Sequence, residues 1–73
     1  MHIIQDIKMT IQEIKNYFGI TPVYQFNGSM DELHEMQVLN NSSYNTLVVS
    51  DIIYFISVNP VTDSRAIDIT GVE

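Results

Sequence analysis

The chain has 73 residues and a formal net charge of −6 at pH 7, with nine carboxylates against three lysines and arginines. This length fits one small domain, residues 1–73, near the lower limit at which a chain folds alone, and a hydrophobic fraction of 45% excludes a disordered tail. Cysteine is absent, which excludes disulfide bonds and thiolate metal sites.

Apolar residues near the N-terminus recur at helical intervals. They are Ile4, Ile7, Ile11, Ile14 and Phe18. Because this spacing places them on one helix face, and Gly19 follows where a helix end favours glycine, the pattern predicts one helix over residues 3–18. A capping box from Thr10 to Glu13 supports an alternative, in which a short strand precedes a helix over residues 11–18.

The next segment combines a strand pattern with a second helix start. Residues 22–27 are rich in β-branched and aromatic side chains, which favours a strand ending at an Asn-Gly turn. Ser29 and Glu32 then form another capping box, which predicts a short helix over residues 30–38. A polar loop over residues 40–43 follows.

The C-terminal half is rich in β-forming residues. Residues 46–49 and 52–58 predict two strands, and the Ser50-Asp51 dipeptide between them can turn a hairpin. Since this dipeptide lacks the glycine that two-residue hairpins usually contain, one long, bent strand is the alternative. Residues 65–70 alternate imperfectly, as an edge strand does.

Together these elements predict an α+β domain. We expect the N-terminal helix and the short second helix to pack on a small, mainly antiparallel sheet of three to four strands. The run 52–58 is apolar on both faces. We therefore expect it to be a central strand, covered by a helix on one face and by a partner or a second copy on the other.

Catalytic chemistry finds little support in the sequence. A nucleophile needs a base within hydrogen-bond reach, and His2 and His34 are the only imidazoles. The three glycines match no phosphate-binding or dinucleotide-binding pattern. We expect the protein not to be an enzyme and to hold no cofactor.

One spacing is compatible with a metal site. Asp31, His34 and Glu35 lie three and four residues apart, so a helix would place them on one face, as in carboxylate metal sites. A solvated acidic face explains the same residues, because carboxylates suit the first turn of a helix. We expect no metal, and keep a small-ligand or metal-binding module as an alternative function.

The charge pattern is the strongest guide to function. Between Lys15 and Arg65 the chain has no lysine or arginine, so we expect neither direct nucleic-acid binding nor membrane binding. We expect instead another protein with a basic or neutral surface as the partner. The expected partner-binding residues are the carboxylates Asp31, Glu32, Glu35 and Asp51, with Tyr44 and Tyr54 as aromatic anchors.

These features predict a small acidic protein-binding module. The composition favours residues with AT-rich codons, typical of low-GC bacteria and their phages. We therefore expect an inhibitor, of the kind that phages and mobile elements encode, that blocks a host nucleic-acid enzyme or defence nuclease by covering a basic surface. DNA mimicry is a less favoured form, because five carboxylates between Lys15 and Arg65 make a sparse array.

A structural homo-oligomer is the other alternative, most simply a homodimer with strand 52–58 as its interface. We find no signal-peptide core, since Gln5, Asp6 and Lys8 interrupt the apolar N-terminus. The expected location is the cytoplasm, that of a bacterial host if a phage encodes the protein.

Overall fold

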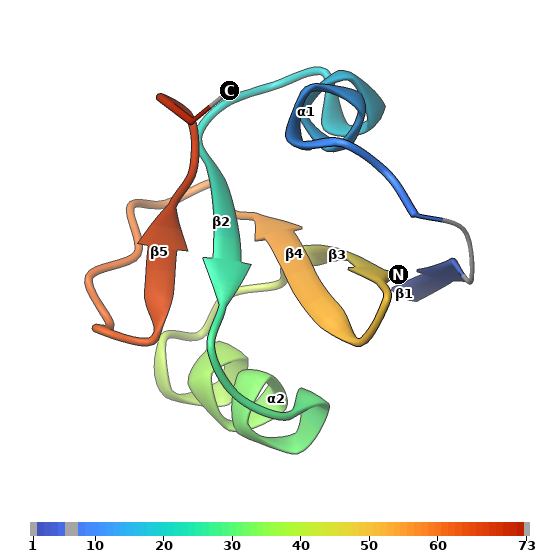
Figure 1. Cartoon of the computed structure of the whole chain (residues 1–73). Coiled ribbons are helices and arrows are strands. Elements are labelled where there is room, and N and C mark those ends of the chain that lie inside the picture. The colour runs from blue at the N-terminus through green and yellow to red at the C-terminus, as the bar shows by residue number, and fades with distance from the viewer. Residues whose placement is uncertain (1, 6–7, 73) are drawn as a thin grey trace.

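A computed structural model describes residues 2–5 and 8–72 (Figure 1). The elements in chain order are β1 (His2–Gln5), α1 (Ile11–Phe18), β2 (Val23–Phe26), α2 (Met30–Leu39), β3 (Asn45–Val49), β4 (Ile52–Ile56) and β5 (Ala66–Asp68). The described strands form one sheet in the order β1-β3-β4-β2-β5. All neighbours are antiparallel except β1 and β3, which are parallel. The predicted α+β fold with a mainly antiparallel sheet is confirmed, and β1 adds a fifth strand.

The prediction of one helix over residues 3–18 was wrong, and the strand-then-helix alternative is correct. The backbone of β1 pairs with β3, with Ile3 opposite Leu47. α1 starts only after Thr10, whose side-chain oxygen accepts from the Glu13 N–H at 3.1 Å while Glu13 Oε1 accepts from the Thr10 N–H at 2.9 Å. The capping box thus fixes the helix start. Ile7, which belonged to the predicted helix face, lies outside the described residues.

The central elements follow their sequence signals closely. α2 begins after Ser29, whose hydroxyl accepts from the Glu32 N–H at 3.2 Å, and the predicted strand over residues 22–27 is β2. β3 and β4 form a hairpin, not one bent strand. Ser50 and Asp51 take the turn with φ of 50° and 67°. Positive φ at both positions gives the turn whose twist matches that of antiparallel strands, even without glycine.

The helices cover opposite faces of the sheet, with α1 above it and α2 below it in Figure 1. On the α1 side the core consists of Ile14, Val23, Leu47, Val49, Tyr54, Ile56 and Ile69. On the α2 side it consists of Tyr24, Phe26, Leu33, Met36, Tyr44, Ile53 and Phe55. The protein therefore has three layers, with one apolar core on each side of the sheet.

β4 is the central strand, as predicted, but the expected cover of its second face by a partner was wrong. β3 and β2 occupy its two edges. Ile53 and Phe55 are buried on the α2 side, while Tyr54 and Ile56 are buried on the α1 side. The two helices therefore cover both apolar faces of β4, so the two-sided apolar pattern does not require a second copy. Over residues 53–56, β4 offers no surface to a partner.

β5 forms an edge of the sheet, as expected for residues 65–70, and among the described strands it pairs only with β2. Within residues 2–5 and 8–72, no helix combines the length and the apolar character that crossing a bilayer requires.

Candidate partner-binding surface on α2

Two of the predicted partner-binding residues belong to the core. Tyr44 is 2% exposed and its ring lies 4.7 Å from that of Phe55, while Tyr54 is 5% exposed on the α1 side. Burial also raises the pKa of the Tyr54 hydroxyl. Neither ring is available to a partner, so their prediction as aromatic anchors was wrong.

The four predicted carboxylates are all exposed, but they differ in what they contact. Asp31 and Glu35 make no side-chain hydrogen bond or ion pair with the part of the chain that the structure describes. Glu32 is engaged. Its Oε1 accepts from the Ser29 N–H at 3.1 Å, which lowers its pKa, and its Oε2 lies 3.5 Å from Arg65 Nη1. Asp51 stands apart from α2, on the β3–β4 turn.

Several of these charged residues lie at the same end of the sheet. Phe26, at the end of β2, pairs with Ile53 at the start of β4, so the β2–α2 connection and the β3–β4 turn leave the sheet at the same end. The Asn27 N–H donates to the Arg65 carbonyl at 2.8 Å, which brings Arg65 to this end as well. Asp51 therefore shares an end of the molecule with the start of α2.

Arg65 is the only lysine or arginine that follows Lys15, and its charge is already paired. Its Nη2 and Nε donate to the two carboxylate oxygens of Asp63 at 2.8 and 3.0 Å. The guanidinium also lies 5.5 Å from the centre of the Phe26 ring, within cation–π range. Because these contacts hold Arg65 against its own chain, the nearby surface keeps its negative character.

The Arg65–Asp63 ion pair should contribute to folding stability, and we expect acid to remove this contribution. The side-chain hydrogen bonds from Arg65 lower the pKa of Asp63 from 3.8 to about 2. A lowered pKa in the folded state stabilises the fold above the unfolded pKa of about 4, and this contribution disappears as the pH falls through about 2. In urea titrations between about pH 5 and pH 2, the gap between the midpoints of the natural protein and Asp63→Asn should therefore shrink. A constant gap would contradict this linkage.

The outward face of α2 carries apolar residues that the sequence did not identify as exposed. Val38 is 67% exposed and Leu39 is 81% exposed, next to the exposed side chains of His34 and Glu35. We call Asp31, His34, Glu35, Val38 and Leu39 the α2 outer face. It combines free carboxylates in the first two turns of the helix with apolar side chains in its last turn.

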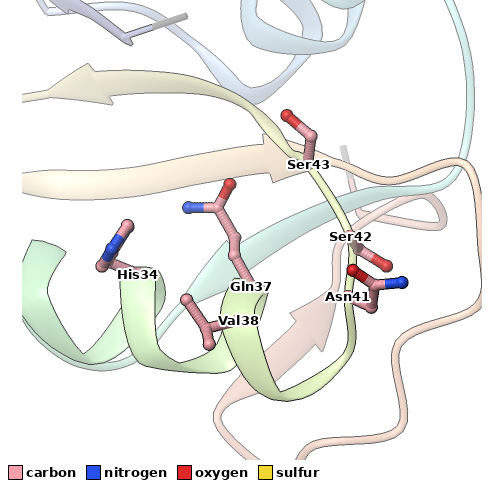
Figure 2. A pocket seen from close by; sticks show the side chains of 6 residues that line it. All are labelled: His34, Gln37, Val38, Asn41, Ser42 and Ser43. Carbon is pink, nitrogen blue, oxygen red and sulfur yellow. The ribbon is translucent and has the colours of Figure 1, made fainter.

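Two hollows flank Val38. One, of about 460 Å³, is lined by His34, Gln37, Val38, Asn41, Ser42 and Ser43. Figure 2 shows that these residues come from α2 and from the segment that follows it. The other hollow, of about 340 Å³, is lined by His34, Glu35, Val38 and Leu39 and is almost wholly apolar. Both are open and shallow, which suits the side chains of a protein partner better than an enclosed small molecule.

In the part of the chain that the structure describes, the fold brings no further metal ligand to the helix residues whose spacing suggested a metal site. Within residues 2–5 and 8–72, no group of three histidine, aspartate or glutamate side chains is arranged to hold a metal ion. Asp31, His34 and Glu35 thus remain neighbours on one helix, with no ligand from another described element.

No family model, curated protein or solved structure matches this chain. The exposed chemistry of α2 is thus the main guide to what the protein does. Leu39 was hard to select from the sequence as an exposed residue, because it continues the three-residue interval of Leu33 and Met36 and so suggested a place on the buried stripe.

Proposed function

We propose that the protein is a binding module that contacts another protein through the α2 outer face. The observation that carries this proposal is the pair of exposed apolar side chains, Val38 and Leu39, at the end of a helix whose free carboxylates are Asp31 and Glu35. Exposed apolar side chains rimmed by charge are typical of interaction sites, where burial supplies affinity and charge supplies specificity.

The partner should present a basic surface. The net charge of −6 and the pairing of Arg65 with Asp63 favour a positively charged partner and disfavour nucleic acid itself. A protein that handles nucleic acid offers such a surface. We therefore propose that the protein inhibits a host enzyme of this class, such as a defence nuclease, by covering its basic surface, as a phage-encoded or mobile-element protein would. Asp51 and Glu32 would contribute charge at the rim.

Affinity capture tests this function. The tagged protein would be incubated with a lysate of a low-GC bacterium at low and at high salt, and captured proteins identified by mass spectrometry. We expect a basic, nucleic-acid-handling partner that is lost at high salt. Its nuclease or nucleic-acid-binding activity should fall when the protein is added. Capture of nothing, or of acidic proteins only, would contradict the proposal.

Matched variants locate the surface. Leu39→Ser should lower capture about tenfold, the effect of losing one well-packed apolar contact, and the Asp31→Asn, Glu35→Gln double variant should weaken the salt dependence. Val58→Ser is the control, because Val58 is 96% exposed but lies on the loop after β4. Equal losses from Leu39→Ser and Val58→Ser would show that α2 is not the binding surface.

A further inference from the structure

We propose that the partner binds the α2 outer face with an α-helix that has an apolar ridge and a basic end. This inference rests on the proposed function and names the kind of element that the partner presents. It follows from the shape of the α2 surface, from the order of its chemistry along the helix axis, and from the β5 edge of the sheet.

The shape of the surface fits a helix. Residues four apart on a helix form a ridge, and the α2 outer face has two such ridges. One consists of Asp31, Glu35 and Leu39, and the other of His34 and Val38. The apolar hollow of about 340 Å³ lies between them, because its four lining residues are two from each ridge. A groove of this kind accepts the corresponding ridge of a second helix, with the axes crossing at about −50°.

The chemistry changes along the groove. The free carboxylates of Asp31 and Glu35 occupy the first two turns, while Val38 and Leu39 occupy the last turn. A complementary helix therefore needs apolar side chains over the end of α2 and lysine or arginine over its start. Ser42 and Ser43, which line the hollow on the other side of Val38 (Figure 2), add hydroxyl groups for the polar rim of such an interface.

An added strand is a poorer fit at the C-terminal edge of the sheet. β5 has three residues, and the side chain of Asp68, its last residue, accepts from the Thr70 N–H at 2.8 Å where the strand ends. Short, charged edge strands are a known protection against pairing with another chain. At this edge the fold resists strand addition, whereas α2 offers an uncovered groove.

Three synthetic peptides of about 18 residues, each long enough for five helical turns, test the inference. The first has leucines three and four residues apart with lysines at one end. The second keeps the lysines but replaces each leucine with serine. The third keeps the leucines but replaces each lysine with glutamate. Binding to the isotope-labelled protein would be followed by amide chemical shifts, which report both the affinity and the residues contacted.

We expect the first peptide to bind at least about tenfold more tightly than the other two, with the largest shifts in α2. Leu39→Ser should weaken its binding about tenfold, while Val58→Ser should change it less than about twofold. The inference fails if the shifts fall on another face, or if the serine peptide binds as well as the leucine peptide.

The outcomes separate this inference from the proposed function. If the serine peptide binds as tightly as the leucine peptide while lysate capture still depends on Leu39, the partner does not use a helix ridge, although the binding function stands. If lysate capture yields no basic partner, the proposed function itself fails. If light scattering finds a dimer that Leu39→Ser dissociates, a second copy covers the groove, and the inference of a basic helix is wrong.

Discussion

Phe55→Ala is expected to leave the chain largely unfolded at room temperature. Phe55 is fully buried on β4. The centre of its ring lies 5.3 Å from the ring centre of Tyr24, 6.3 Å from that of Phe26 and 4.7 Å from that of Tyr44. Truncating a buried phenylalanine to alanine costs about 3–5 kcal/mol, and the core of a domain of this size without disulfides supplies a total stability of only about 3–5 kcal/mol. One substitution therefore removes a free energy as large as the whole stability of the domain.

Circular dichroism during heating and urea titration measures this effect. Phe55→Leu keeps most of the side-chain volume, so it should still unfold cooperatively, with a lower urea midpoint than the natural protein. Val58→Ala, at a 96% exposed position, should change the free energy of unfolding by less than about 0.5 kcal/mol. A cooperative transition of Phe55→Ala close to that of Val58→Ala would show that the aromatic cluster contributes little to stability.

Local signals in the sequence explain most of the fold. Both capping boxes, at Thr10 and at Ser29, start a helix where they occur. The N-terminal periodicity misled because spacing alone does not tell a helix from a short strand followed by a helix. What decides between them is the parallel pairing of β1 with β3, a contact between residues more than 40 positions apart. No local pattern encodes such a contact.

The candidate site was harder to predict, for a reason that lies in helix geometry. Leu33 and Met36 face the sheet, and Leu39 continues the same interval of three residues. Each such step falls about 60° short of a full turn, so two steps rotate Leu39 about 120° away from Leu33 and out of the core. A stripe that is apolar in sequence therefore leaves the core in the last turn of α2.

The prediction of Tyr44 and Tyr54 as exposed aromatic anchors was wrong because both side chains are buried. Aromatic residues with a hydroxyl group suit both interfaces and cores, and only the layers above and below the sheet decide which. Tyr44 precedes β3 and packs on Phe55 under α2, and Tyr54 faces α1. With two helices on opposite faces, β4 has no solvent-facing side over residues 53–56, so its tyrosine could not serve a partner.

Ile14→Ala is expected to release α1 from the sheet. Ile14 is the fully buried residue of this eight-residue helix, and truncating a buried isoleucine costs about 2–5 kcal/mol. Helices this short are unstable alone, so α1 depends on its contact with the sheet. The C-terminal segment should loosen as well, because Lys15 Nζ donates to the carbonyls of Thr70 and Val72.

Hydrogen exchange of backbone amides distinguishes this local release from general unfolding. In Ile14→Ala, the amides of α1 and of residues 70–72 should lose protection first, while α2 keeps its own core through Leu33. Asn16→Ala, on the exposed side of α1, should leave protection unchanged. Equal loss of protection in α1 and α2 would mean that the two cores unfold as one unit. Since the two cores share only the sheet between them, we expect α2 and its outer face to outlast α1, which would keep the proposed binding surface intact when α1 is released.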